Sequence, residues 1–120
     1  MLFRSVPGMS ANIRAVSIID RYLEHARIFI FYNGGEERYY VSSADWMTRN
    51  LTHRIEVGFP IYDELIQKEL RQFIDLQLRD NTKARLLAKG KLNKYKRIAG
   101  EKIQSQIDFY KYLRNKHQSE

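Results

Sequence analysis

Hydrophobic and polar positions recur along this chain with two periods, and each period predicts one type of element. The helical period is clearest over residues 62–79, where one face carries Leu65, Ile66, Leu70, Phe73, Ile74 and Leu78. Asp63 and Glu64 lie where the positive end of such a helix favours acidic side chains. A second amphipathic helix is predicted over residues 101–116. The C-terminal half therefore contributes two helices.

The first half shows strand-like patterns separated by a glycine turn. Residues 27–32, RIFIFY, are nearly all apolar and β-prone, which predicts a strand buried on both faces. Residues 33–35, NGG, supply the positive φ angles of a tight turn, so residues 36–41 are expected to return as a second strand. Residues 54–61 predict a third strand, which Pro60 closes at a sheet edge.

The stretch from Ser10 to His25 allows two interpretations. Its apolar residues recur at helical spacing, which predicts a helix that ends near His25. The β-branched residues Val16, Ile18 and Ile19 instead favour an extended first half. The pattern by itself leaves both open.

A few strands followed by two helices predict an α/β fold with a small sheet and packed helices. Residues 45–49 are expected to form a short irregular or helical turn, with Trp46 and Met47 packed beneath it. The large aromatic residues of this half are interpreted as core: Phe29, Phe31, Trp46 and Phe59. Because the strands are few for a sheet that covers two helices, we expect a part of a larger domain.

Composition narrows the class of protein. A chain of 120 residues is one domain or part of one. The absence of cysteine excludes disulfides and cysteine nucleophiles, and it agrees with a cytoplasmic location. The histidines have no clustered spacing, so no metal site is expected from His25, His53 and His117. No apolar run reaches the roughly 20 residues of a membrane span.

The net charge of +7 is concentrated in one stretch. Residues 81–100 contain seven basic residues and no acid, namely Lys83, Arg85, Lys89, Lys91, Lys94, Lys96 and Arg97. The rest of the chain has 14 basic and 14 acidic residues, so it is neutral as a whole. A polyanionic partner is one interpretation of this basic stretch, and a solvated loop is the other.

The predicted hairpin gathers chemically useful residues at one end. In an antiparallel hairpin, the start of the first strand lies beside the end of the second. We therefore expect His25 and Arg27 to lie near Ser43 and Asp45. A histidine, a cation and a corner with a hydroxyl and an acid are typical of a phosphate site, in which His25 would transfer a proton.

Charged residues around the third strand complete the candidate set. Arg27 opens a strand predicted to be buried, so it should meet an anion or a carboxylate such as Glu24 or Glu56. We expect Glu56 to orient His25 and Arg54 to face a nucleotide. The alternatives are a surface ion pair between Arg54 and Glu56, and a purely structural histidine bonded to a carbonyl.

Four blocks of the sequence resemble a known family. DRYLEHARIFIF, NGG, SSADWMTRNLTHRIEVGFPI and DNTKAR are similar to the C-terminal part of the bacterial polyphosphate kinases that work through a phosphohistidine. The likeness runs from about Val6 onward and is most specific in the SSADWMTRN block. It implies that residues 1–120 are a partial C-terminal catalytic domain with a phospholipase-D-like fold.

The resemblance implies an ATP–polyphosphate phosphotransferase, a kinase that moves a terminal phosphate reversibly between ATP and inorganic polyphosphate. It places the phosphorylated histidine, Mg²⁺ and other ATP contacts mainly in parts of the enzyme outside this chain. His25 then matches a second histidine at the ATP phosphates. The implied partners are ATP or ADP, polyphosphate, the remainder of the kinase chain, and further copies in a homo-oligomer.

The candidate residues depart from the phospholipase-D pattern at two positions. Arg27 replaces a lysine, and Asp45 replaces the asparagine of a Gly-Ser-x-Asn corner, which argues against phosphodiester hydrolysis. A guanidinium grips phosphate bidentately, which favours handling a phosphoanhydride chain. The expected ATP- and phosphate-binding residues are His25, Arg27, Ser43 and Arg54, with His25 catalytic. Asp45 is expected to hold the local backbone and, with Glu56, to support this set.

A different function class also fits the charge distribution. The basic stretch, with Tyr95 among its lysines, is compatible with a non-enzymatic module that binds polyanions or nucleic acid. The pattern of aromatic residues typical of RNA-binding sheets is absent from the sequence. ATP-dependent phosphoryl transfer by the longer parent protein would distinguish the two classes.

Overall fold

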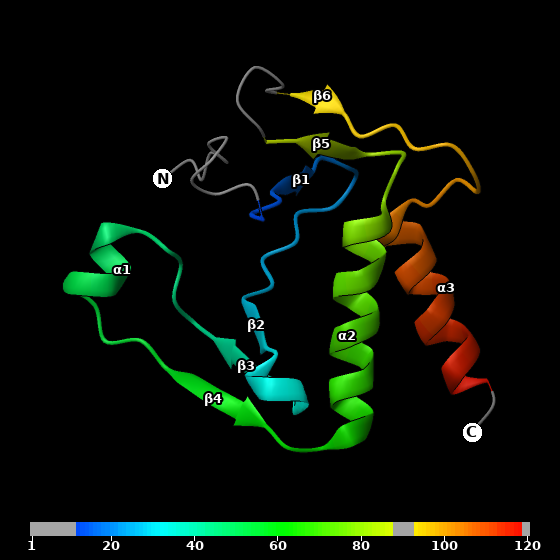
Figure 1. Cartoon of the computed structure of the whole chain (residues 1–120). Helices are drawn as coiled ribbons and strands as arrows, with labels where there is room; N and C mark the ends of the chain where they lie inside the picture. Colours follow the sequence, from blue (N-terminus) through cyan, green and yellow to red (C-terminus); the bar gives the residue numbers. More distant parts are fainter. Residues whose placement is uncertain (1–11, 88–92, 119–120) are drawn as a thin grey trace. The chain divides into compact units, whose positions relative to one another are not determined.

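The computed structural model describes residues 12–87 and 93–118, which belong to two compact units. The first unit is Glu24–Arg71, and the second combines Leu2–Leu23 with Gln72–Glu120. Each unit has its own three-stranded antiparallel sheet, and Figure 1 labels the strands and helices. The predicted α/β class is therefore confirmed.

The first unit contains the predicted hairpin. Its elements are β2 (Ile28–Phe31), the 3₁₀ turn η1 (Asn33–Gly35), β3 (Arg38–Ser42), α1 (Thr48–Thr52) and β4 (Gly58–Ile61). β2 and β3 pair antiparallel, with Ile28 opposite Val41 and Phe31 opposite Arg38. The turn between them has positive φ angles throughout, from 45° at Asn33 to 111° at Gly35. Glycine adopts these angles without steric cost, as the NGG pattern predicted.

The third strand is shorter than its sequence pattern. β4 begins at Gly58, so Arg54 and Glu56 lie in an irregular segment rather than on a strand face. Pro60 lies opposite Tyr40, and β4 pairs with β3 alone, giving the sheet order β2-β3-β4. Proline has no backbone N–H to donate, which suits this edge position.

The helix predicted over residues 62–79 is α2 (Glu64–Arg79). Its first turn is capped by Asp63, whose Oδ1 accepts hydrogen bonds from the backbone N–H groups of Leu65 (2.8 Å) and Ile66 (3.0 Å). An acidic side chain that accepts these otherwise unpaired donors stabilises a helix start. The boundary between the two units falls inside this helix.

The second unit consists of β1 (Val16–Ile18), the end of α2, β5 (Ala84–Leu86), β6 (Lys94–Tyr95) and α3 (Ser105–His117). Its sheet order is β1-β5-β6. The helix predicted over Ser10–His25 is wrong for the part described, 12–25, and the extended alternative is right for β1. Gln106 explains part of this, because its side-chain amide pairs with both the N–H (3.0 Å) and the C=O (2.7 Å) of Tyr22.

Asp80 organises the turn from α2 into β5. Its side chain is completely buried, and Oδ1 accepts the backbone N–H groups of Thr82, Lys83 and Ala84 at 2.7–3.0 Å. Oδ2 accepts the N–H of Ser105 at 2.8 Å, where α3 begins. Burial raises the pKa of Asp80. The hydrogen bonds from these four backbone N–H groups together lower it by more, so the pKa of Asp80 lies below its ordinary value.

The aromatic residues interpreted as core are largely exposed, and that prediction is wrong. Phe31, Trp46 and Phe59 are 56%, 55% and 51% exposed, and Met47 is also exposed. Phe29 is half-buried and stacks between Phe31 (6.5 Å) and Trp46 (6.2 Å). A sheet of three short strands has too few neighbours to cover both faces.

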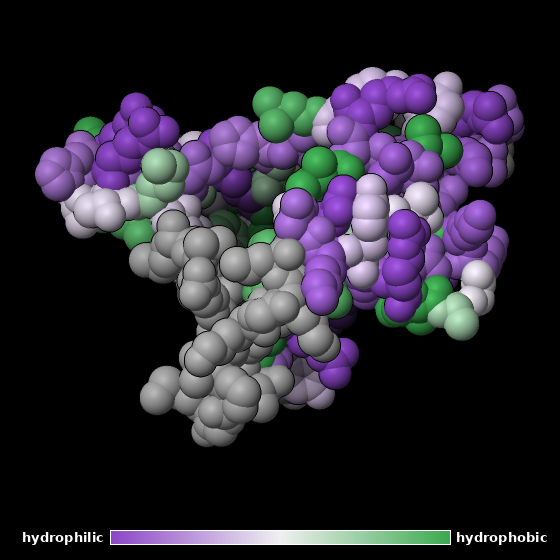
Figure 2. Space-filling view, turned by 90° about the horizontal axis from the view of Figure 1, so that it is seen from above, coloured by the Kyte–Doolittle hydropathy of each residue, from purple (hydrophilic) through white to green (hydrophobic). Residues whose placement is uncertain are grey.

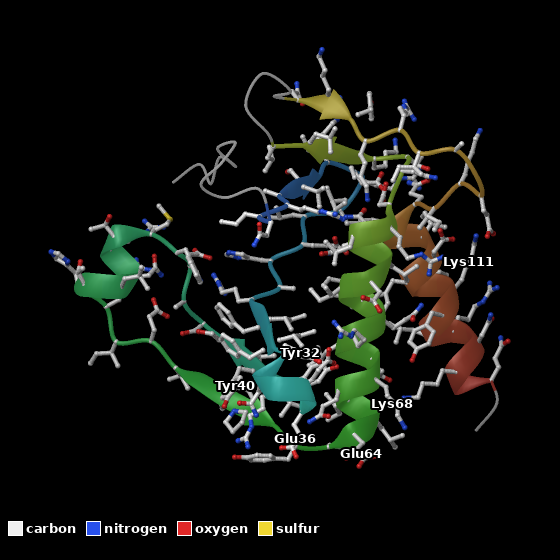
Figure 3. All side chains as sticks on the ribbon, in the orientation of Figure 1. Tyr32, Glu36, Tyr40, Glu64, Lys68 and Lys111 are labelled. Atoms are coloured by element: carbon white, nitrogen blue, oxygen red, sulfur yellow. The ribbon has the colours of Figure 1, made fainter. Side chains whose placement is uncertain are left out.

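The exposed aromatic surface extends along the hairpin. Phe31 meets Tyr40 of β3 edge to face at 5.8 Å, and Figure 3 labels Tyr40 together with Tyr32 at the start of η1. Figure 2 shows other hydrophobic residues, in green, reaching the surface among hydrophilic ones. Among the described residues, the buried hydrophobic side chains are Tyr39, Leu76 and Ala84.

Candidate functional site

Three predicted site residues meet at the open end of the hairpin in the first unit. Arg27 lies just before β2, and its C=O accepts the N–H of Ser42 at 3.0 Å, which continues the β2–β3 ladder. Asp45 follows β3, and its Oδ1 accepts a hydrogen bond from Arg27 Nε at 2.7 Å. The same oxygen lies 2.9 Å from His25 Nε2. We call His25, Arg27 and Asp45 the histidine cluster.

The histidine cluster allows two proton arrangements. Arg27 Nη2 also lies 2.9 Å from His25 Nε2, and one ring nitrogen cannot donate to Asp45 and accept from Arg27 at once. A protonated Nε2 donates to Asp45, whereas an unprotonated Nε2 accepts from the guanidinium. The His25 side chain is 63% exposed, so its ring is accessible to a ligand in either arrangement.

The charges within the histidine cluster stabilise one another. The hydrogen bond from Arg27, followed by that from His25, lowers the pKa of Asp45 from 3.8 to about 2. The same bond to Asp45 raises the pKa of Arg27. Asp45 therefore stays ionised and holds the guanidinium in one orientation at neutral pH.

A second group of polar residues lies beside the histidine cluster. The hydroxyl of Ser43 donates a short hydrogen bond to Glu56 Oε2, while Asn50 Nδ2 donates to Glu56 Oε1 at 2.7 Å. Ser43 Oγ in turn accepts the N–H of Val57 at 3.0 Å. These bonds, from Ser43 first and Asn50 second, lower the pKa of Glu56. We call Ser43, Asn50 and Glu56 the glutamate cluster.

Ser43 lies past the end of β3 and joins Glu56, not His25. The hairpin was expected to bring His25 near Ser43, and the pairing of Ile28 with Val41 and the bond between Arg27 and Ser42 put Arg27 opposite Ser42. Ser43 then bonds to the segment before β4, where its N–H donates to the C=O of Val57 at 2.9 Å and its hydroxyl donates to Glu56.

The supporting carboxylates make other contacts than those expected. Arg27 was expected to meet an anion or a carboxylate, and the carboxylate it meets is Asp45. Glu56 was expected to orient His25, but Asp45 makes that contact, and Glu56 accepts hydrogen bonds from Ser43 and Asn50. Ser43 has one proton, which it donates to Glu56, so its expected phosphate contact requires that bond to open. Arg54 is exposed, and its positive charge helps to lower the pKa of Glu56, although it donates no hydrogen bond to another described residue.

Asn50 is the residue of the two clusters that the sequence analysis missed. It is 5% exposed on α1, although asparagine is usually found at the surface. Its Oδ1 is buried without a hydrogen-bond partner among the described residues, while its Nδ2 holds Glu56. The sequence offered only a weak signal, an asparagine six positions before a glutamate.

The described residues do not form a metal centre. Within 12–87 and 93–118, no group of three or more histidine, aspartate or glutamate side chains is arranged to hold an ion. Asp45 and Glu56 are both engaged in their own clusters. In the same ranges, no helix has the length and apolar character needed to cross a membrane.

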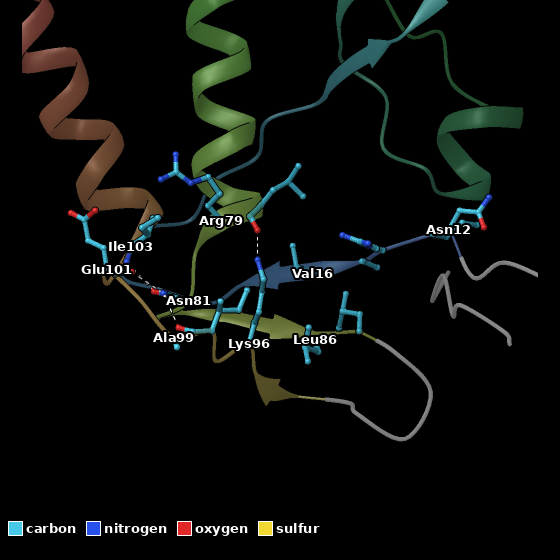
Figure 4. Close-up of a pocket in the computed structure, with 15 residues that line it drawn as sticks. Asn12, Val16, Arg79, Asn81, Leu86, Lys96, Ala99, Glu101 and Ile103 are labelled. Atoms are coloured by element: carbon cyan, nitrogen blue, oxygen red, sulfur yellow. Dashed lines mark hydrogen bonds between the residues drawn. The ribbon is translucent and has the colours of Figure 1, made fainter.

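A separate cavity lies in the second unit, and Figure 4 shows its lining. Its wall combines apolar residues such as Val16, Leu86 and Ile103 with polar ones. Asn81 closes one side, because its Nδ2 donates to the C=O of Glu101 (2.9 Å) and its Oδ1 accepts the N–H of Ile103 (2.9 Å). These bonds hold the loop between β6 and α3 in place.

The fold and the histidine cluster together define the class, an α/β domain that presents a histidine and an oriented arginine at a strand end. Comparison with known proteins then specifies the family. A family model described as "Polyphosphate kinase C-terminal domain 2" matches residues 1–106. The chain is 45% identical over 120 residues to the polyphosphate kinase of Escherichia coli O6:H1, covering 99% of this chain and 17% of that protein.

Other relatives agree. The polyphosphate kinase of Bacillus anthracis is 45% identical over 107 residues, covering 88% of this chain and 15% of the relative. The crystal structure of polyphosphate kinase from Porphyromonas gingivalis matches with a TM-score of 0.89 and 42% identity, over 96% of this chain and 18% of that chain. The chain therefore belongs to the polyphosphate kinase family, which confirms the resemblance. It spans less than a fifth of the length of these relatives.

Proposed function

We propose that this chain supplies one half of the phosphate site of an ATP–polyphosphate phosphotransferase. In that reaction, the terminal phosphate of ATP is transferred reversibly to inorganic polyphosphate. The observation that carries the proposal is the histidine cluster, in which Asp45 orients Arg27 beside the exposed ring of His25. Membership of the polyphosphate kinase family supports the reaction class.

Each residue of the histidine cluster has a distinct role in the proposal. Arg27 contacts the phosphate oxygens, because a guanidinium offers several donors and keeps its charge. His25 is the catalytic residue, since an imidazole at the phosphates can donate a proton to an oxygen or accept one. Asp45 fixes the guanidinium direction, which reduces the reorganisation needed when phosphate arrives.

Two further residues extend the proposed site. Arg54 is exposed and has no hydrogen-bond partner among the described residues, so it is available for the nucleotide phosphates. Ser43 contacts the phosphate only when its hydroxyl group releases its hydrogen bond to Glu56. The remaining contacts of ATP and of Mg²⁺, and the phosphorylated histidine, belong in this proposal to other parts of a longer kinase chain.

The test compares histidine and arginine variants in a full-length polyphosphate kinase that contains this sequence. We expect His25→Ala and Arg27→Gln each to lower the phosphoryl-transfer rate by about 100-fold or more, the size typical of a lost proton-transfer or charge-stabilising group. His53→Ala and Arg38→Gln are matched controls, because both residues are exposed in the same unit and lie outside the clusters. Equal rates in the His25 and His53 variants would contradict the proposal.

A non-enzymatic polyanion-binding module remains the second candidate because of the basic stretch. It predicts polyphosphate binding without any effect of His25→Ala on phosphoryl transfer. The two candidates are therefore separated by the same set of variants.

A further inference from the structure

The basic stretch, which the proposed active site does not use, forms a hairpin in the second unit. β5 and β6 pair antiparallel with Arg85 opposite Tyr95, and the bond from Lys96 N–H to the C=O of Ala84 (2.8 Å) continues the ladder. Figure 1 shows the two strands side by side. Because side chains alternate between the faces of a strand, Arg85, Tyr95 and Arg97 share one face.

Several cations of the stretch are already engaged. Lys96 lies on the other face, and its Nζ donates a short hydrogen bond to the C=O of Leu78 at the end of α2, as Figure 4 shows. Lys83 lies 3.9 Å from the buried carboxylate of Asp20. Lys89 and Lys91 fall outside the described residues. The number of basic residues in this stretch therefore overstates how many cations are available to bind a ligand.

Two arginines are arranged around one aromatic ring. The Cζ atoms of Arg85 and Arg97 lie 3.4 Å and 4.3 Å from the ring centroid of Tyr95. Both guanidinium groups therefore lie within cation–π distance of the same ring. Cation–π attraction holds them in these positions.

The two guanidinium groups retain donors for a ligand. Arg85 Nη1 donates to the C=O of Asn93 at 3.1 Å, and its Nη2 makes no hydrogen bond to a described residue, whereas its Nε is buried out of reach of a ligand. Arg97 is exposed and forms no ion pair with a described acid. A like-charged pair held together without a carboxylate lowers its electrostatic energy by binding an anion.

We propose that Arg85 and Arg97, held by Tyr95, form a second binding site for an extended phosphate chain, distinct from the histidine cluster. The choice of inorganic polyphosphate as ligand rests on the proposed function. Planar guanidinium groups suit successive phosphate groups, which need no base for recognition. A single-stranded nucleic acid fits less well, because two guanidinium groups already lie against the Tyr95 ring and compete with base stacking there.

The experiment titrates the 120-residue chain with inorganic polyphosphate of defined length at several salt concentrations. The double variant Arg85→Gln/Arg97→Gln is compared with Arg21→Gln/Arg114→Gln, which removes the same charge from exposed positions of the same unit. We expect the first variant to bind about tenfold or more weakly, since charge-assisted contacts are lost. For this variant, the slope of log affinity against log salt concentration should also decrease by the equivalent of about one to two phosphate contacts. The control should keep the slope of the parent chain.

A tyrosine series tests whether the ring, and not only charge, builds the site. Tyr95→Leu keeps both cations but removes their support, so we expect weaker binding with an unchanged salt slope. Tyr95→Phe keeps the cation–π contacts and should bind like the parent chain. Far-UV circular dichroism checks that each variant retains its fold. Equal losses in the two double variants would show that charge alone matters and would overturn the proposed site.

A further variant separates this inference from the proposed function. Loss of polyphosphate binding in Arg27→Gln, together with normal binding in Arg85→Gln/Arg97→Gln, would overturn the site at Arg85 and Arg97 and leave the proposed function standing. Normal binding in Arg27→Gln, together with loss of binding in Arg85→Gln/Arg97→Gln, would support the site at Arg85 and Arg97. Tighter binding of a single-stranded oligonucleotide than of polyphosphate with equal phosphate number would overturn the ligand assignment.

Discussion

Asp45 determines the geometry of the candidate site. One carboxylate oxygen accepts a hydrogen bond from Arg27 and lies within hydrogen-bond distance of His25, so the orientation of both side chains depends on it. Phospholipase-D-like sites place an asparagine at this corner, and an amide offers no charge to a guanidinium. The acid at position 45 therefore goes together with the arginine at position 27, because each stabilises the charged form of the other.

This coupling predicts how Asp45 titrates. The pKa of Asp45 lies at about 2 instead of 3.8, so the folded protein favours the ionised carboxylate. The stabilisation is present above pH 4 or so and is lost as the pH falls through about 2. NMR of the side-chain carboxyl carbon should give a midpoint near pH 2.

Removing the partner should reverse this shift. In Arg27→Gln the midpoint of Asp45 should move back toward 3.8, because the largest stabilising hydrogen bond is lost. Arg38→Gln removes an exposed charge from β3 and should leave the midpoint in place. An unchanged midpoint in the Arg27 variant would show that the hydrogen bond does not hold in solution.

At the scale of elements, the junction after α2 is the most tightly bonded part of the second unit. Asp80 accepts four backbone N–H groups, three from the turn into β5 and one from the start of α3. Phe73 of α2 and Phe109 of α3 meet edge to face at 5.0 Å, which packs the two helices together in this unit. The Asp80 side chain thus links the end of α2, the start of β5 and the start of α3.

We expect Asp80→Asn to destabilise the second unit by about 1–3 kcal/mol, the range for leaving a buried donor unpaired. An asparagine side chain keeps one acceptor oxygen but turns an amide N–H₂ toward either Ser105 or the turn. Urea denaturation monitored by circular dichroism measures the loss. Glu64→Gln changes an exposed carboxylate at the start of α2, in the first unit, and should cost less than about 0.5 kcal/mol. Equal midpoints for the two variants would contradict the role of Asp80.

At the scale of the whole molecule, the chain holds one histidine cluster, whereas the proposed reaction needs a phosphorylated histidine elsewhere. The chain corresponds to 15–18% of the length of its relatives. Many large apolar side chains are exposed, with Leu23 at 97% and Ile55 at 99%.

We therefore expect the 120-residue chain alone to show no phosphoryl transfer and no phosphohistidine when it is given ATP or polyphosphate. The physical reason is that His25 is placed to assist at phosphates, while the nucleophile of the proposed reaction lies outside this chain. A phosphotransfer assay with radiolabelled ATP measures both, and a full-length polyphosphate kinase is the positive control. An acid-labile phosphate on His25 would contradict this expectation.

The sequence by itself determined the features that depend on near neighbours. The apolar face of α2 and its cap at Asp63, the positive-φ turn at 33–35 and the hairpin around it all follow from residues within a few positions of one another. The family resemblance also rests on short contiguous blocks. Local sequence is sufficient in these cases because the stabilising contacts are local.

Tertiary structure alone decided which groups meet across the chain. Tyr22 lies outside any helix, and its backbone pairs with Gln106, 84 positions away; no periodicity near Tyr22 signals that contact. His25 meets Asp45, whereas Ser43, which follows the end of β3, bonds to Glu56 and to the C=O of Val57. Hydrophobic pattern predicts that strands pair, but side-chain packing and the closing bonds select the register, and with it the residues that share a site.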